Sequence, residues 1–164
     1  MADIKKKWER LKVDYLRYIK AERRLSDNTV AAYRRDYDAF MGYVMHFHFA
    51  APKQITPQII SKYMNWLYRS GCSSASQARK LSGVKSLYNY LLINEQIEQL
   101  PTDSVEPPKQ ERILPDMLTV EEIDAMIATF DMTTVKGCRD NAIVEVLYST
   151  PLLVSELVSL RIDN

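Results

Sequence analysis

"SDNTVAAYRRDYDAFMGYVM", residues 26–45, decides the fold of this chain because its apolar residues recur at helical spacing along its whole length. Ser26 is a favourable N-cap, and Leu25 and Val30 are spaced to pack against each other as a hydrophobic staple across the start of the helix. The inner stripe of this helix comprises Val30, Tyr33, Tyr37, Phe40, Met41 and Val44. The stretch therefore predicts an amphipathic helix with one apolar face.

Three further helices are predicted around this one. The first covers about residues 4–22, and the next begins at Thr56-Pro57, where proline suits the first helical position, and stops at Gly71. The last begins among the serines of residues 73–76. The inner faces of the first and last helices carry Trp8, Leu11, Tyr15, Tyr18 and Ile19, and Leu81, Val84, Tyr88, Leu91 and Leu92. Because no strand-like alternation stands out, we expect an all-α, four-helix domain over residues 1–100.

The composition changes after this domain. Prolines punctuate residues 101–115, which predicts an extended linker. Beyond it, Thr119 and Glu122 have the spacing of a capping box that opens a new helix, and another helix is expected over about 137–149. Residues 116–164 are near the lower size limit for independent folding, so we expect the truncated beginning of a second domain.

The net charge of +1 conceals an asymmetry between the two parts of the chain. Residues 1–94 hold 17 Lys and Arg against 7 Asp and Glu, a net charge of +10, whereas residues 95–164 hold 5 against 14, a net charge of −9. A basic first part suits a polyanionic partner such as DNA. Without a signal peptide, a membrane-length apolar run or a CxxC spacing, we expect a cytoplasmic protein with no membrane association.

The faces that two helices turn away from their apolar stripes combine small residues, hydrogen-bonding residues and an arginine. These faces comprise Asn28, Ala31, Ala32 and Arg35 on the helix from Ser26, and Arg79, Ser82, Gly83 and Ser86 on the last helix. Small residues let a helix approach bases in the DNA major groove, although the same faces could pack on another helix. The flanking residues are placed for phosphate contacts. We therefore predict contacts to double-stranded DNA from Asn28, Thr29, Arg34, Arg35, Arg79, Lys80, Ser82 and Lys85.

Other chemistry is poorly supported by the sequence. His46 and His48 point to different sides of a helix, and no nearby Cys or carboxylate completes a metal-ligand set. The chain shows no glycine-rich phosphate loop, nucleophile elbow or paired carboxylates. We therefore expect no metal, no cofactor and no catalytic residue in these 164 residues.

Three stretches, in order along the chain, resemble the tyrosine recombinase, or phage integrase, family, and most closely its bacterial Xer-type members. They are "YIKAERRLSDNTVAAYRRDYDAF" (18–40), "ARKLSGVKSLYNYLL" (78–92), and "LTVEEIDAMI" (118–127) followed by "RDNAIVEVLYSTPLLVSEL" (139–157). The resemblance implies a helical, SAM-like core-binding domain on one side of the DNA and a catalytic domain on the other. It also implies metal-free attack of a tyrosine on a phosphodiester, with arginines stabilising the phosphate charge, by a homo- or hetero-tetramer of recombinase subunits on DNA.

One departure from the family pattern bears on activity. After "LYST" the family usually has Gly-Leu-Arg, whereas this chain has Pro151-Leu152-Leu153. Leu153 stands at the position of the first catalytic arginine, and an aliphatic side chain cannot donate to a phosphate. The family's tyrosine nucleophile normally lies further downstream than Asn164, so we expect no strand cleavage by this chain. Two alternatives remain open: a helical protein-interaction or accessory module that binds a recombinase, and an inhibitory truncated recombinase that occupies sites without cutting.

Overall fold

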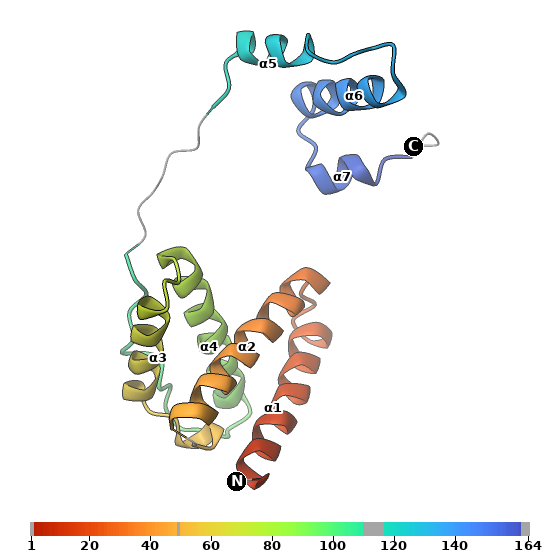
Figure 1. The fold of residues 1–164 in the computed structure, drawn as a ribbon. Helices are drawn as coiled ribbons and strands as arrows, with labels where there is room; N and C mark the ends of the chain where they lie inside the picture. Colours follow the sequence, from red (N-terminus) through yellow and green to blue (C-terminus); the bar gives the residue numbers. More distant parts are fainter. Residues whose placement is uncertain (1, 49, 110–116, 162–164) are drawn as a thin grey trace. The chain divides into compact units, whose positions relative to one another are not determined.

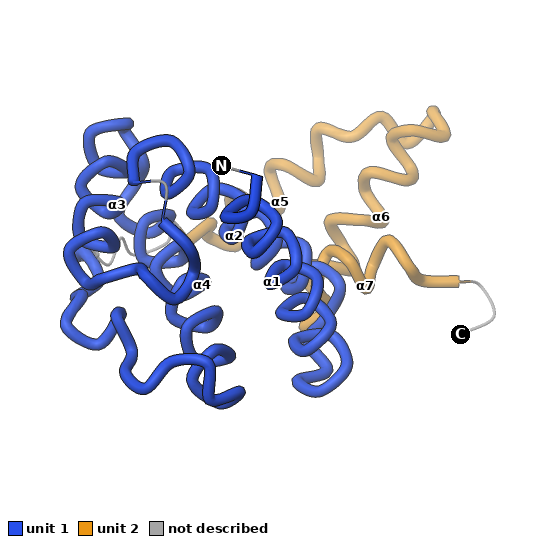
Figure 2. The backbone as a smooth tube through the Cα atoms, turned by 90° about the horizontal axis from the view of Figure 1, so that it is seen from below, with its two compact units in different colours: residues 1–111 blue, residues 112–164 orange. Residues whose placement is uncertain are grey.

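The computed structural model describes residues 2–48, 50–109 and 117–161. The chain divides into two compact units, Met1–Glu111 and Arg112–Asn164 (Figure 2). The described residues form helices and no strand, which confirms the all-α prediction. The helices of the first unit are α1 (Ala2–Ala21), α2 (Asp27–Phe47), the short 3-10 helix η1 (Pro52–Gln54), α3 (Pro57–Arg69) and α4 (Ser74–Ile93) (Figure 1). Those of the second unit are α5 (Val120–Ile127), α6 (Val135–Ser149) and α7 (Val154–Val158).

The ends of the helices are set by local hydrogen bonds. The Ser26 hydroxyl accepts from the Thr29 N–H at 3.3 Å, and Ser73 caps α4 in the same way. After α3, Gly71 has a φ of +75°, which favours glycine. The Gly71 N–H donates to the Tyr68 carbonyl and the next N–H donates to the Leu67 carbonyl, at 3.0 and 3.1 Å, as in a Schellman motif. The predicted N-cap at Ser26 and the predicted stop at Gly71 are therefore confirmed.

Phe40 of α2 lies at the centre of the four-helix core. Helix α2 packs against both α1 and α4 (Figure 1), and the Phe40 side chain is fully buried. Its ring centroid lies 5.9 Å from Trp8 of α1, 5.1 Å from Tyr63 of α3 and 6.4 Å from Tyr88 of α4, each in an edge-to-face arrangement. Such aromatic pairs add about 0.5–1.5 kcal/mol each beyond the burial of apolar area. A single side chain thus joins all four helices.

The polar ends of three buried aromatic rings bind backbone groups, whereas the buried Tyr63 hydroxyl has no hydrogen-bond partner among the described residues. The Trp8 indole N–H donates to the carbonyl of Ala50 at 2.9 Å, and the Tyr37 hydroxyl donates to the carbonyl of Trp8 at 2.6 Å. The Tyr88 hydroxyl donates to the carbonyl of Pro52 at 3.0 Å. These bonds satisfy buried polar groups, and those to Ala50 and Pro52 fix the segment between α2 and α3 to the core.

The stretch predicted as a linker, 101–115, begins with residues that belong to the first unit. Pro101, Thr102 and Val105 are buried, and Val105 is part of the hydrophobic core. Proline excludes continued helix but does not prevent an irregular segment from covering apolar surface, and composition alone does not separate these cases. Residues 110–116 lie outside the described residues, and the remainder of the linker, like the domain boundaries, stays a prediction.

The second unit has well-formed helix ends but little buried surface. The Thr119 hydroxyl accepts from the Glu122 N–H at 3.2 Å while the Glu122 carboxylate accepts from the Thr119 N–H at 2.8 Å, which confirms the predicted capping box. Within 117–161, Gly137 is the one buried residue. Apolar side chains such as Val135 and Val158 are 90% and 79% exposed. The helices described in this unit therefore do not cover their own apolar faces.

Candidate nucleic-acid interface

The outer face of α2 agrees with the prediction from its helical periodicity. Asn28, Ala31 and Arg35 are exposed on the side of α2 that is opposite its buried stripe, and Ala32 is half-buried beside them. Arg35 forms no ion pair with any residue that the structure describes. This face therefore presents a small, uncrowded surface with one available guanidinium group.

The face predicted for α4 is only half correct. Arg79 and Ser82 are exposed and Lys85 is half-buried, but Gly83 is buried at the contact with α2. Ser86 is half-buried and its hydroxyl accepts from the Tyr15 hydroxyl of α1 at 3.0 Å. Glycine and serine permit a close approach of any partner, and here the partners are neighbouring helices of the same domain.

Tyr15 keeps its proton in this contact. Burial raises the pKa of Tyr15 to about 12, and the hydrogen bond to Ser86 offsets only part of that increase. The hydroxyl is therefore neutral near pH 7 and acts as the donor. Ser86 is accordingly a structural contact between α1 and α4, and its predicted place on an outward face is wrong.

The closest approach of α2 and α4 lies at Asp36 and Gly83. A Cβ atom added at Gly83 would lie 2.9 Å from the Cβ of Asp36 and 3.1 Å from one of its carboxylate oxygens. Asp36 is 1% exposed, so its charge is buried between the helices. A buried carboxylate requires compensation by a cation or by hydrogen bonds.

Two basic side chains of α4 supply that compensation. The Nη1 atom of Arg79 donates to Asp36 Oδ2 at 2.6 Å, and Nζ of Lys80 lies 3.9 Å from Asp36 Oδ1. The Lys80 side chain is only 20% exposed. The sequence predicts that Lys80 contacts a phosphate, but its side chain is directed to the interior. Arg79, which is predicted to contact bases, is bonded through one nitrogen to the Asp36 carboxylate.

The sequence prediction did not include Asp36 as a functional residue. Its position three residues after Tyr33 and four before Phe40 places it on the inner stripe of α2, which was the available signal. An acid on an inner stripe implies a buried cation partner, but periodicity does not identify a partner 43 residues away in the sequence.

A pair of glycine substitutions tests the α2–α4 contact. Gly83→Ala should lower the free energy of unfolding of the first unit by up to about 2 kcal/mol, because overpacking costs about 1–3 kcal/mol and the better helix propensity of Ala returns about 1. Gly42→Ala is the matched control, since Gly42 is exposed within α2 with no atom near its added Cβ. That control should raise stability by up to about 1 kcal/mol. Urea unfolding followed by tryptophan fluorescence measures both, and changes of the same sign would contradict the close contact.

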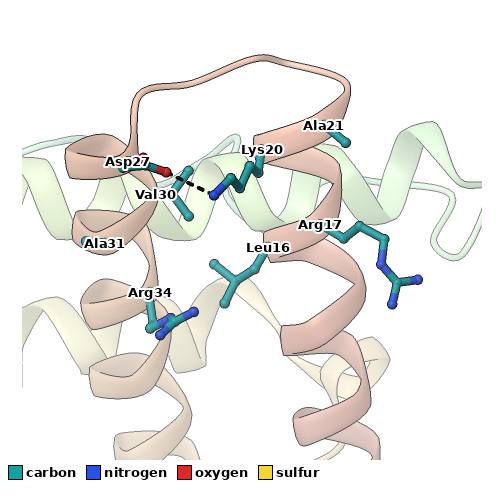
Figure 3. A pocket seen from close by; sticks show the side chains of 8 residues that line it. All are labelled: Leu16, Arg17, Lys20, Ala21, Asp27, Val30, Ala31 and Arg34. Carbon is teal, nitrogen blue, oxygen red and sulfur yellow. Dashed lines mark ion pairs between the residues drawn. The ribbon is translucent and has the colours of Figure 1, made fainter.

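The two flanking residues predicted on α2 lie in different surroundings, Thr29 in the N-cap and Arg34 on the side of α1. The Thr29 hydroxyl lies 2.9 Å from the Ser26 hydroxyl within the N-cap. Arg34 lines a groove between α1 and α2 (Figure 3), which the ion pair of Lys20 with Asp27, 3.0 Å apart, spans. Arg34 therefore lies on the α1 side of α2, away from the α4 contact.

The remaining candidates carry little chemistry. No group of three His, Cys, Asp or Glu side chains suited to a metal ion occurs in the described ranges. His48 lies within 3.3 Å of the Tyr43 hydroxyl, and Cys72 and Cys138 are free. Leu153 is 66% exposed directly before α7, and its N–H donates to the carboxylate of Glu156 at 2.8 Å.

Among the described helices, none is both long and apolar enough to span a membrane.

The described geometry defines a class of protein, a small four-helix domain. Its second and fourth helices pack against each other at a buried ion pair, and both carry basic residues on their exposed faces. Residues 13–95 match the family model of the phage integrase N-terminal SAM-like domain. Over 151 residues the chain is 35% identical to the tyrosine recombinase XerD of Staphylococcus aureus (strain Mu50 / ATCC 700699) and 37% identical to that of Staphylococcus haemolyticus (strain JCSC1435). The chain belongs to the phage integrase, or tyrosine recombinase, family. Each alignment covers 92% of this chain and 51% of the relative, so the chain spans about half the length of the curated relatives it matches.

Proposed function

We propose that this chain is the DNA-binding portion of a site-specific tyrosine recombinase and that it contacts double-stranded DNA through the outer faces of α2 and α4. The observation that carries the proposal is the distribution of acidic residues around these helices. Helix α4 contains no Asp or Glu, although it carries Arg79, Lys80 and Lys85. A helix without an acid does not repel a phosphate backbone, and Lys85, unlike Arg79 and Lys80, pairs with no carboxylate in the described ranges.

Each acidic residue of α2 pairs with a basic residue of a neighbouring helix. Asp27 pairs with Lys20 of α1 at 3.0 Å, and Asp38 pairs with Lys12 of α1 at 2.6 Å. Asp36, the third acid, is buried against α4. The outer faces of α2 and α4 therefore combine Arg35 and Lys85 without an opposing carboxylate, and a polyanion can approach them without repulsion.

The proposal extends to the complete protein only through its relatives. The relatives are named tyrosine recombinases. By analogy, we assign residues 116–164 to the beginning of a catalytic domain, place the protein in the cytoplasm, and infer a homo- or hetero-tetramer of recombinase subunits on DNA. At the position of Leu153 the family has an arginine that stabilises the charge on the DNA phosphate. We therefore expect residues 116–164 to contribute no catalytic donor.

A titration of labelled duplex DNA at two salt concentrations tests the proposed function. With the phosphate contacts of Arg35 and Lys85 alone, affinity should fall roughly 10-fold between about 50 and 200 mM monovalent salt, because each neutralised phosphate releases counterions. An accessory module that binds a recombinase predicts no duplex binding even at the lower salt concentration. The absence of duplex binding by the folded chain would therefore favour that second function.

A further inference from the structure

The ion pair between Asp36 and Arg79 leaves most of the arginine available. A guanidinium group has five N–H donors, and one of them, on Nη1, is used by Asp36. The Arg79 side chain is 49% exposed, whereas that of Asp36 is 1% exposed. Arg79 thus extends from a buried anchor to the surface, and no other hydrogen bond holds it within the part of the chain that the structure describes.

The anchor restricts how Arg79 can move. Asp36 lies where Gly83 allows α2 and α4 to approach most closely, and its carboxylate is enclosed by the two helices. Because Arg79 is bonded to this fixed group at 2.6 Å, it has lost much of its rotamer freedom before any ligand arrives. Ordering a side chain in advance lowers the entropic cost of binding.

The same anchor changes what Arg79 can contribute to DNA binding. Its charge is already balanced by Asp36, so it adds less than a free cation to the general attraction of phosphates. What remains is a planar set of N–H donors in a fixed direction. Such a set matches the O6 and N7 acceptors of guanine in the major groove, which arginine contacts as a bidentate donor.

We propose that Asp36 is a positioning residue that fixes Arg79 to read a guanine edge, so that Arg79 supplies sequence specificity while Arg35 and Lys85 supply phosphate attraction. The inference rests on the proposed function, since it assumes that the α2–α4 surface contacts duplex DNA. It separates the tasks of Arg35 and Arg79, which the sequence alone places on equivalent outward faces, and keeps Lys85 as a phosphate contact.

The test begins by selecting preferred duplexes from a randomised DNA library with the full 164-residue chain. Kd is then measured for the selected duplex and for duplexes in which single G·C pairs are replaced by A·T. The parent should discriminate by ~10- to 100-fold at one guanine. Arg79→Met and Asp36→Asn should each lose most of that discrimination at the same pair.

Lys85→Met is the matched control. It should weaken binding to both duplexes equally, keep the discrimination, and lower the slope of log K against log salt by about one. Arg79→Met should leave that slope nearly unchanged, and Asp36→Asn, which leaves the Arg79 charge unbalanced, should not lower it. A purely structural role for Asp36 would lower thermal stability without removing the preference for one base pair.

The double variant Asp36→Asn/Arg79→Met separates positioning from independent effects. It removes both charges of the pair and leaves Lys80 as a cation at this contact, so its folding is checked by circular dichroism. If Asp36 acts through Arg79, the double variant should lose as much discrimination as Arg79→Met alone. Should Asp36→Asn fold poorly, Gly83→Ala displaces the same carboxylate and should weaken discrimination in its place.

Four outcomes overturn the inference, and the first is an Asp36→Asn variant that loses stability but keeps the preference for one base pair. If the double variant loses discrimination by the product of the two single losses, Asp36 acts independently of Arg79. If Arg79→Met keeps the full preference for the G·C pair, Arg79 reads no base. A uniform loss with a lower salt slope in Arg79→Met would make Arg79 a phosphate contact. In each case the proposed function stands, whereas a parent chain that binds no duplex would overturn both.

Discussion

Replacing Phe40 by Ala is expected to lower the free energy of unfolding of the first unit by about 3–5 kcal/mol, a large part of the stability of a small domain. Phe40 is fully buried, and its ring contacts Trp8, Tyr63 and Tyr88 on the three other helices. The substitution leaves a cavity at the point where the helices meet, and rigid helices close such a cavity only partly.

Urea unfolding followed by tryptophan fluorescence measures this effect in the first unit alone, because both tryptophans, Trp8 and Trp66, belong to that unit. Phe47→Ala is the matched control on the same helix, since Phe47 is 52% exposed. Its substitution should cost at most about 1 kcal/mol. Equal losses for Phe40 and Phe47 would contradict a core centred on Phe40.

Charge reversal on the outer faces should have the largest effect on DNA binding. In Arg35→Glu/Lys85→Glu, we expect the affinity for duplex DNA to fall by about 100-fold or more at about 0.1 M salt, because two phosphate contacts are lost and two repulsive charges are added. Arg35 is exposed and Lys85 half-buried, and neither pairs with an acid in the described ranges, so the loss of stability should be small.

Lys5→Glu/Lys6→Glu provides the control, with the same change of net charge on exposed residues near the start of α1. Fluorescence anisotropy of a labelled duplex gives both affinities, and circular dichroism confirms that both variants are folded. The control should bind within a few-fold of the parent. Equal losses in the two double variants would mean that net charge alone, and no particular face, governs binding.

The helices could be predicted from the sequence because their signals are local. Ser26, Thr119 and Gly71 define helix ends through bonds to residues no more than five positions away, and the apolar stripes follow directly from helical periodicity. The family resemblance added the SAM-like fold, which the match over residues 13–95 confirms.

The outer face of α4 could be predicted only in part, because its errors arise from tertiary contacts. Gly83 and Ser86 have the same size and polarity whether they approach DNA or a neighbouring helix, and the structure places them against Asp36 and Tyr15. Likewise, nothing in the local sequence indicates that Arg79 pairs with a carboxylate on α2. On α2, the face of Asn28, Ala31 and Arg35 was predicted correctly because few partners compete for it.

The central claim is that the outer faces of α2 and α4 hold the DNA backbone. It is tested most directly by the salt dependence of duplex binding in a variant that replaces two cations of these faces by neutral glutamine. The slope of log K against log salt is compared between the parent and Arg35→Gln/Lys85→Gln, with Lys5→Gln/Lys6→Gln as the control. We predict that the slope of the first variant is smaller in magnitude by about 1.8, because each lost phosphate contact removes about 0.9, and that the control keeps the parent slope. An unchanged slope in Arg35→Gln/Lys85→Gln would contradict the account, since phosphates would then be held by other residues.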